Sequence, residues 1–266
     1  MPTSTSSGNA LAATSSRRRA STEKSRPSVF WPLAAVIAPL IALIFKVEIE
    51  GAENLPREGA YVLAPNHYSE SDPLAVALAV WKIGRAPRFM AKESLFRVPV
   101  LGWILRITGM VPVARSSSAA SARQTLETSE TLVEHGRGVI VYPEGTLTRD
   151  PELWPMRGKT GAVRLALAGD IPLIPMAQWG CQAVLPRYGK LKLWPLRRPV
   201  KVIIGAPVDI SKRRVDEGQT ASLVAATDVL MADISKLLSV IRDEPAPAVR
   251  WNPADHGQRE TGRLES

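Results

Sequence analysis

The sequence predicts a single α/β domain with a central sheet flanked by helices. From Val47 to about residue 242, short apolar runs alternate with stretches of helical periodicity, as strands alternate with helices in such folds. No linker rich in Gly, Ser or Pro divides this region, and it contains no internal repeat. With 266 residues, 45% of them hydrophobic, the chain has ample material for one core. We therefore place one folded domain at residues 47–242.

Six strands and five helices are expected within this domain. The strands are expected at 61–64, 88–91, 110–114, 139–142, 173–178 and 200–204. The helices are expected at 73–82, 100–107, 119–135, 158–168 and about 220–241. The last helix carries an apolar face that includes Leu223, Leu230, Ile234 and Leu238, a pattern typical of a helix packed on a sheet.

The two ends of the chain differ from the domain in composition. Residues 1–28 are rich in Ser, Thr, Ala and Arg, and residues 243–266 are polar and interrupted by prolines, so we expect two disordered tails. Residues 29–46 are apolar except for Lys46. This segment is short for a complete membrane span and contains Pro39, so we expect a kinked anchor that dips into the bilayer. Such an anchor would keep the basic tail and the domain together on the cytoplasmic face of the cell membrane.

Charge and residue usage narrow the classes of partner. A net charge of +9 and a pI near 10.0 favour an anionic partner: a phospholipid surface, a phosphorylated substrate or nucleic acid. The single cysteine, Cys181, excludes an intramolecular disulfide. Of three histidines, His135 reads as a helix end and His256 falls in the expected tail, which leaves His67 as the candidate catalytic imidazole. No P-loop, Gly-x-Gly-x-x-Gly, Cys-x-x-Cys or Gly-x-Ser-x-Gly motif occurs, so we expect no bound metal or cofactor.

The stretch from Asn66 to Pro73 combines that histidine with a carboxylate. Positions five apart lie about 140° apart around a helix, so His67 and Asp72 meet only across a turn. Pro73 suits the first position of a helix and disfavours helical geometry at Asp72, which would then be the N-cap. A hydrogen bond from one ring nitrogen to Asp72 would fix the tautomer and leave the other nitrogen available as a general base. The alternative is a capping aspartate beside an incidental histidine.

A second stretch, Pro143-Glu144-Gly145-Thr146, follows the strand expected at 139–142. Ligands bind to α/β sheets outside the carboxyl ends of the strands. Gly145 permits a backbone turned toward a ligand, Thr146 adds a hydroxyl and an amide, and Glu144 is suited to orienting a substrate hydroxyl. The alternative is an ordinary turn with an exposed acid.

Several cations follow expected strands or lie close to this second stretch. They are Lys92, Arg115, Arg149, Arg157 and Lys159. Taken singly, each reads as a solvated surface charge. Gathered at one edge of one sheet, they would form a phosphate site, in which Arg can bind phosphate through two hydrogen bonds.

Residues 187–201 interleave six cations with apolar side chains and contain no acid. Leu191, Leu193, Trp194 and Leu196 are the apolar members. We expect this segment to contact an anionic membrane surface, with the cations on the head groups and Trp194 at the interface. The alternative is a basic hairpin exposed to water.

Taken in order, these stretches resemble a known family. Asn-His-x-x-x-x-Asp at 66–72, Arg115 after an apolar strand, Pro-Glu-Gly-Thr at 143–146 and the proline-flanked strand at 171–175 resemble the four sequence blocks of the PlsC-like 1-acylglycerol-3-phosphate acyltransferases, which are glycerolipid acyltransferases. The resemblance runs from about residue 51 to 210, and the order of the blocks makes it specific. It implies a single domain with a central mixed sheet flanked by helices, similar to glycerol-3-phosphate acyltransferase, and the apolar membrane anchor expected at residues 29–46 would precede this domain.

The resemblance also implies roles for individual residues. His67 would deprotonate a glycerol hydroxyl and Asp72 would orient it, and the alkoxide would attack the thioester of acyl-CoA or acyl carrier protein without a metal. The other residues would position the glycerol phosphate; they are Lys92, Arg115, Glu144, Gly145, Thr146, Arg149 and Lys159. Lysophosphatidic acid would become phosphatidic acid for phospholipid biosynthesis at an anionic membrane, and no nucleic acid partner is expected.

The chain departs from the family pattern at one position. The family usually continues Pro-Glu-Gly-Thr with Arg, whereas this chain has Leu147, then Thr148 and Arg149. Arg149 would reach the same phosphate from a displaced position, or the site would hold a different head group. Two alternatives stay open: an acyltransferase for another lysophospholipid or a glycolipid, and a non-catalytic basic protein that binds membranes or nucleic acid.

Overall fold

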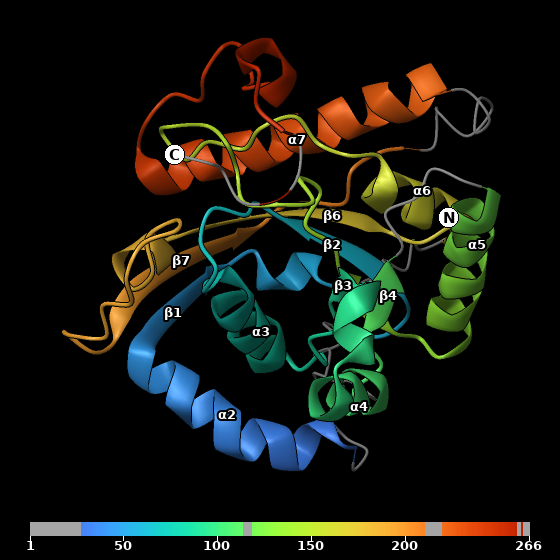
Figure 1. Cartoon of the computed structure of the whole chain (residues 1–266), viewed down its shortest axis with the longest axis horizontal. Helices are drawn as coiled ribbons and strands as arrows, with labels where there is room; N and C mark the ends of the chain where they lie inside the picture. Colours follow the sequence, from blue (N-terminus) through green and yellow to red (C-terminus); the bar gives the residue numbers. More distant parts are fainter. Residues whose placement is uncertain (1–27, 114–118, 211–219, 260–261, 263–266) are drawn as a thin grey trace, which may run out of the picture.

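A computed structural model of the chain describes residues 28–113, 119–210, 220–259 and 262. It confirms the α/β architecture: a mixed five-stranded sheet lies between two groups of helices (Figure 1). Residues 1–27 of the tail expected at 1–28, and the candidate Arg115, lie outside the described residues.

The main sheet has the strand order β1-β7-β6-β2-β5. Its strands are β1 (Phe45–Glu50), β2 (Tyr61–Pro65), β5 (Gly138–Ile140), β6 (Leu173–Trp179) and β7 (Arg198–Ile204). All neighbouring strands run parallel except β6 and β7, which follow one another in the chain and pair in the antiparallel sense. Strand β2 therefore ends between its parallel neighbours β5 and β6, and the two stretches with candidate catalytic residues leave the sheet at this edge.

Six helices surround the sheet within the described residues. They are α2 (Phe30–Ile44), α3 (Asp72–Ile83), α4 (Pro99–Ile107), α5 (Ala119–Glu134), α6 (Gly161–Gly169) and α7 (Thr220–Arg242). The five helices predicted from periodicity all form, with ends that differ by at most a few residues. In Figure 1, α6 and α7 cover one face of the sheet, while α3 and α2 cover the other.

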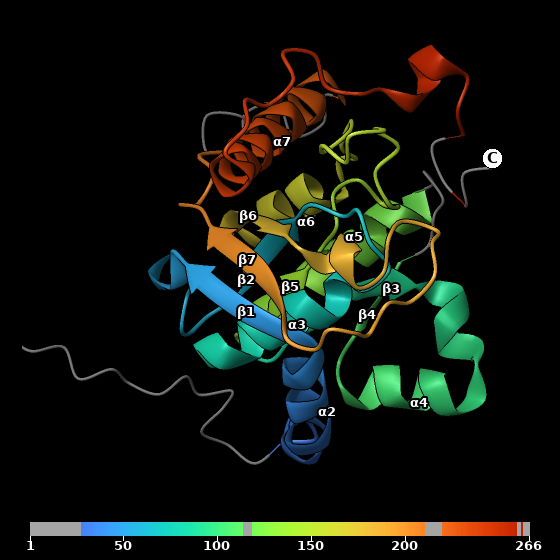
Figure 2. The same ribbon diagram turned by 90° about the vertical axis from the view of Figure 1, so that its left-hand side faces the viewer.

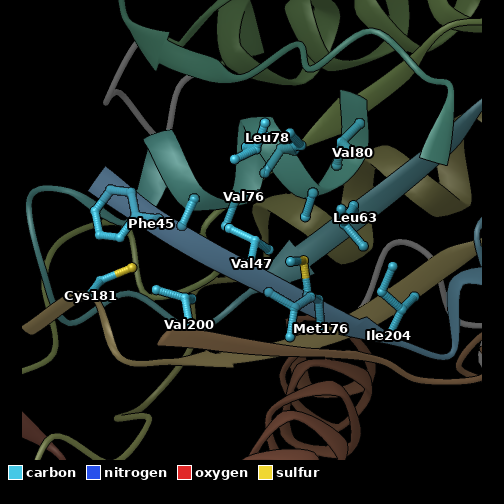
Figure 3. Close-up of a cluster of buried hydrophobic side chains, with 14 of the residues drawn as sticks. Phe45, Val47, Leu63, Val76, Leu78, Val80, Met176, Cys181, Val200 and Ile204 are labelled. Atoms are coloured by element: carbon cyan, nitrogen blue, oxygen red, sulfur yellow. The ribbon is translucent and has the colours of Figure 1, made fainter. Parts of the chain in front are cut away.

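The two faces of the sheet carry separate apolar cores. One core packs β1, β2 and β7 against α3 and includes Phe45, Leu63, Val76, Met176 and Val200 (Figure 3). The other packs the opposite face against α6 and α7, and its members include Val62, Val139, Leu165, Leu230 and Ile234. Because β2 is covered on both faces, all five of its residues are buried, as expected for an interior strand of an α/β sheet.

Two of the predicted strands form outside the main sheet. The expected strands at 88–91 and 110–114 form β3 (Met90–Lys92) and β4 (Val111–Val113), which pair with each other in a separate two-stranded sheet. A single bridge from Phe89 to Ile140 links this sheet to β5. Strand β1 was not predicted, because its alternation of apolar and charged residues directly follows the apolar run.

The apolar segment expected to be an anchor is a helix that belongs to the domain. Helix α2 contains Pro39, buries Phe30 and Ile41, and packs on α3 and β1. Its last expected residues, Phe45 and Lys46, open strand β1 instead. Among the helices of the described residues, none is both long and apolar enough to cross a membrane.

The prediction of a disordered tail after residue 242 is wrong for the described part of that segment. Residues 243–259 return along α7, and Pro253–His256 form a short 3₁₀ helix, η5. The carbonyl of Trp251 accepts the Arg157 N–H at 2.8 Å, and Arg250 pairs with Asp228 on α7 at 2.9 Å. These polar contacts, and the stacking of Trp251 on His256, hold the segment in place. Such contacts leave no helical or strand periodicity in the sequence, so the order of this segment was not predicted.

Candidate active site

The loop after β2 brings His67 and Asp72 together, as predicted. His67 Nδ1 lies 3.0 Å from Asp72 Oδ2, and the aspartate side chain is fully buried while that of His67 keeps 17% exposure. With Nδ1–H donated to the carboxylate, the lone pair of Nε2 points away from Asp72. The pair therefore has the geometry of an imidazole general base with its tautomer held by a carboxylate.

Asp72 is the first residue of α3 rather than its N-cap, which is Ser71. Its Oδ2 atom also accepts the main-chain N–H groups of Tyr68, at 2.7 Å, and Ser69, at 2.8 Å. A single carboxylate oxygen therefore holds both the loop and the imidazole, so the turn that Pro73 initiates is built around the candidate base.

Aromatic contacts at the imidazole were not predicted. The ring of Tyr142 stacks on that of His67 with centroids 4.0 Å apart and planes inclined by 25°. Phe89 lies beyond it, with its ring centroid 6.2 Å from that of Tyr142. The Tyr142 ring limits rotation of His67, and the only sequence signal for it was its position at the end of a strand beside Pro-Glu-Gly-Thr.

Two polar side chains secure the start of the catalytic loop and were also missed. Asn66 donates from Nδ2 to the carbonyl of Gln178 at 3.1 Å and accepts the Gln178 N–H at 2.9 Å. The Tyr68 hydroxyl donates to Gln178 Oε1 at 3.0 Å. These bonds tie the residues on each side of His67 to the neighbouring strand β6.

Glu144 lies beneath this loop and not at its surface. Its carboxyl group is fully buried and accepts the main-chain N–H of His67 at 2.9 Å and that of Met156 at 3.1 Å. We predicted that Glu144 would either orient a substrate hydroxyl or be exposed in a turn, and the structure corrects both readings, because both carboxylate oxygens accept main-chain N–H groups of the protein itself. Glu144 therefore positions the main chain of His67. The two residues are 77 positions apart in the sequence, so this role depends on the tertiary fold.

Burial raises the pKa of Glu144 from 4.5 to about 8, against a smaller lowering by the N–H groups of Met156 and His67. Between pH 4.5 and 8 the folded state keeps a proton that the unfolded state has lost, so the free energy of unfolding should fall as the pH rises. The contribution is at most about 1.4 kcal/mol per pH unit.

Glu144→Gln removes this proton exchange, so its unfolding free energy should depend less steeply on pH than that of the wild type. Urea titrations of both proteins across this range test the expectation. Equal pH slopes for the two proteins would contradict it.

The residues after Glu144 divide between surface and core. Gly145 adopts a positive φ of 71° and is exposed, so it supplies the predicted turn, and Thr146 is half-buried. Leu147, where the family has Arg, is buried with 6% exposure. The replacement of the family's Arg by Leu147 therefore places an apolar side chain in the interior. The next residue, Thr148, donates its main-chain N–H to the His67 carbonyl at 2.7 Å.

Arg149 does not face solvent as a displaced phosphate ligand would. Its side chain is 2% exposed, and Nη2 donates to the carbonyl of Gly262, at 2.9 Å, in the C-terminal segment. Its Nε–H is buried without a partner within the described residues. Arg187 lies close by and donates to the carbonyls of Thr148 and Asp150, and burial is the main cause that lowers its pKa.

The remaining candidate cations lie on two different substructures. Lys92 is exposed at the end of β3, in the small sheet, and not at the edge of the main sheet as predicted. Lys159 is exposed beside Gly145, and its main-chain N–H donates to the Pro143 carbonyl at 2.7 Å. A cavity of about 230 Å³ adjoins Glu144, Arg157 and Lys159. The structure therefore groups Arg157 and Lys159, but not Lys92, beside the second stretch.

A protein-family model matches the part of the chain that forms this site. The family model described as "Acyltransferase" covers residues 46–179, half of the chain, and so includes β1 to β6 with both loops of the site. The chain belongs to this acyltransferase family.

Individual members of the acyltransferase family are similar over part of their length. The chain is 31% identical over 169 residues to the chloroplastic 1-acyl-sn-glycerol-3-phosphate acyltransferase BAT2 of Brassica napus, covering 63% of this chain and 46% of that protein. It is 29% identical over 182 residues to the chloroplastic enzyme LPAT1 of Arabidopsis thaliana, covering 68% and 49%. The chain thus spans about half the length of these curated relatives.

A solved acyltransferase has a similar fold. The crystal structure of the 1-acyl-sn-glycerophosphate acyltransferase PlsC from Thermotoga maritima aligns with a TM-score of 0.54 over 77% of this chain and 79% of that chain, at 23% identity. This likeness supports the curled mixed sheet with flanking helices.

Proposed function

We propose that this acyltransferase transfers a fatty acyl group from acyl-CoA or acyl carrier protein to the free hydroxyl of 1-acylglycerol 3-phosphate. The product is phosphatidic acid, a precursor in phospholipid biosynthesis. The observation that carries the proposal is the 3.0 Å contact between His67 Nδ1 and Asp72 Oδ2 in a partly exposed loop. The names of the similar plant proteins support the choice of acceptor.

The reaction needs one base and one acyl thioester. His67 Nε2 takes the proton of the acceptor hydroxyl as its oxygen attacks the thioester carbonyl carbon. The C–S bond then breaks, and the thiolate leaves and receives the proton from the imidazolium. Asp72 stabilises the imidazolium and keeps Nδ1 as the donor, while Tyr142 and Glu144 hold the ring and backbone of His67 in place. Every step is a proton transfer or an acyl transfer, and none uses a metal or bound cofactor.

Exposed cations supply the charge for the acceptor phosphate. Lys159 beside Gly145 is the best placed for it, and Arg157 adjoins the same cavity. Thr146 offers a hydroxyl at this edge, and Lys92 and Arg115 remain candidates for the acceptor phosphate or the phosphates of coenzyme A. Arg149 would join them only if it exchanged its contact with Gly262 for a phosphate oxygen.

A second acceptor class is favoured by two observations. Leu147 is buried where the family has Arg, and the guanidinium of Arg149 is already engaged. A head group that needs fewer cations, in another lysophospholipid or a glycolipid, would fit such a site. We therefore keep this class as the alternative acceptor for the same chemistry.

We also propose that the enzyme works at the cytoplasmic face of the cell membrane, with α2 as a monotopic anchor. The face of α2 away from the domain exposes Trp31, Val36, Ile37, Leu40 and Leu43. A helix that buries one side in the domain and exposes apolar residues on the other suits the bilayer interface.

Acyl transfer from labelled acyl-CoA to 1-acylglycerol 3-phosphate tests the proposal. We expect labelled phosphatidic acid, and less product from lysophosphatidylcholine and from a lysoglycolipid. A preference for either of the latter acceptors would replace the first proposal with the alternative. If acyl-CoA and acyl carrier protein both fail with every acceptor, while the protein shifts RNA or DNA in a salt-sensitive gel assay, it is a non-catalytic binding protein.

A further inference from the structure

Helix α4 presents its apolar side chains to solvent rather than to the core. Only Gly102 of its residues is buried, while Val100 is 72% exposed and Trp103 is 60% exposed. Val98 and Leu101 add to the same apolar surface with 47% and 39% exposure. A helix packed on a sheet would bury these side chains, so the helix is built to contact something outside this domain.

The connection between β6 and β7 also exposes large apolar side chains to solvent. Trp194 is 80% exposed and Leu191 is 59% exposed, and every residue from Lys190 to Arg197 is exposed. Its cations alternate with its apolar side chains, as in Lys190-Leu191-Lys192-Leu193.

Helix α2 lies next to both segments. The Arg197 N–H, in the β6–β7 connection, donates to the carbonyl of Leu43, at the end of α2, at 2.9 Å. Helices α2 and α4 lie side by side on the side of the molecule away from α7 in both views (Figures 1 and 2). Three segments that are far apart in the sequence thus share one side of the domain.

The charge of these segments has a single sign. Residues 29–47, 94–113 and 187–201 contain no Asp or Glu. The nearest described acids already have partners: Glu93 binds Arg97 at 2.9 Å, Glu48 binds Lys46 at 2.7 Å, and Glu70 accepts the Tyr188 N–H at 3.2 Å. The partner of this side must therefore combine an apolar phase with negative charge.

We propose that α4 and the β6–β7 connection extend the α2 anchor into one docking surface for an anionic phospholipid bilayer. Trp103 and Trp194 are suited to the interface between head groups and acyl chains, and Lys190, Lys192 and Arg197 to anionic head groups. An apolar surface rimmed by cations matches such a bilayer better than a soluble anion, which would leave the apolar side chains in water.

The docking surface borders the candidate active site. In the β6–β7 connection, the carbonyl of Leu185 accepts the Ser69 hydroxyl at 2.6 Å, and the Tyr188 N–H donates to Glu70 Oε1 at 3.2 Å. Both contacts are with the loop that holds His67 and Asp72. If the proposed function holds, a lysolipid acceptor would reach the base while its acyl chain stays in the bilayer; lipid binding itself does not depend on that function.

Vesicle flotation of the full chain tests the docking surface. We expect binding to vesicles of phosphatidylcholine mixed with phosphatidylglycerol and weaker binding to phosphatidylcholine alone. Trp103→Glu on α4 and Trp194→Glu in the β6–β7 connection should each lower the vesicle partition coefficient by about tenfold, because each places a charge where an indole is buried in lipid. Lys190→Gln with Lys192→Gln should remove most of the preference for the anionic vesicles.

Exposed valines elsewhere on the molecule provide matched controls. Val240 on α7 is 65% exposed and Val249 is 84% exposed, so Val240→Glu and Val249→Glu add the same charge without touching the surface. Flotation of both controls should equal that of the wild type. If Trp103→Glu and Trp194→Glu bind vesicles as the controls do, the proposal is overturned.

Two further outcomes separate the alternatives. If light scattering finds a lipid-free dimer that Trp103→Glu dissociates, the apolar side is an interface between copies of the chain and the proposal fails. If the protein lacks acyltransferase activity but floats with the expected differences between variants, the docking surface stands and the proposed function fails.

Discussion

His67→Ala should lower the rate of acyl transfer by about 10²- to 10⁴-fold, because it removes the proposed proton acceptor. The wild type and the variant are compared at saturating acyl-CoA and acceptor, so that a difference in kcat reports the chemical step. The fold should survive, since the side chain of His67 is partly exposed and its structural contacts to Glu144 and Thr148 are made by the main chain.

His135→Ala is the matched control for this experiment. His135 lies just past the end of α5 with a side chain 44% exposed, and its ring nitrogen Nδ1 lies 3.0 Å from the carbonyl oxygen of Thr131 in the same helix. Its removal should leave the rate unchanged. A His67→Ala protein that is folded and retains wild-type activity would remove His67 from the mechanism.

Asp72→Asn should also lower kcat by about 10²- to 10⁴-fold while the protein stays folded. The asparagine carbonyl oxygen can accept the main-chain N–H groups of Tyr68 and Ser69 in place of Oδ2, so the loop keeps its hydrogen bonds. What is lost is the negative charge that stabilises the imidazolium. The Michaelis constant for acyl-CoA should change little, because Asp72 is fully buried and does not reach the donor.

Two comparisons separate charge from structure at Asp72. Asp72→Ala should lower stability as well, because two buried N–H groups lose their acceptor at about 1–3 kcal/mol each. Asp243→Asn is the neutral control: Asp243 is exposed and has a φ of 54°, which Asn tolerates. Asp72→Asn activity within twofold of the wild type would show that the carboxylate charge has no part in the reaction.

Local sequence was sufficient to predict most helices and strands and the pairing of two side chains in the site. Apolar periodicity predicted α3 to α7 and most strands because each element shows its own buried face in its own residues. The pairing of His67 with Asp72 could be predicted for the same reason: the two residues are only five positions apart, and Pro73 favours the turn between them.

Contacts between distant segments set the roles that local patterns misassigned. Glu144 looks like a surface acid beside Gly145, yet it is buried because the backbone of His67 and Met156 closes over it. Arg149 looks like a phosphate ligand, yet the C-terminal segment reaches its guanidinium through the Gly262 carbonyl. No residue near either position signals its partner, since a hydrogen bond to a main-chain group leaves no pattern in the partner's side chain.

The same distinction applies to the surface of the protein. The apolar composition of residues 29–46 and the mixture of cations and apolar residues at 187–201 are visible in the sequence. From them we predicted that both segments expose apolar side chains for contact with a membrane. Helix α4 reads locally as an ordinary core helix, and only its position at the side of the sheet leaves Val100 and Trp103 in solvent. Burial of a side chain depends on what packs against it. The tertiary fold places the main chain of His67 and Met156 over Glu144 and places no comparable cover from the described residues over Val100 and Trp103 of α4, so only the structure shows that the first is buried and the other two are exposed.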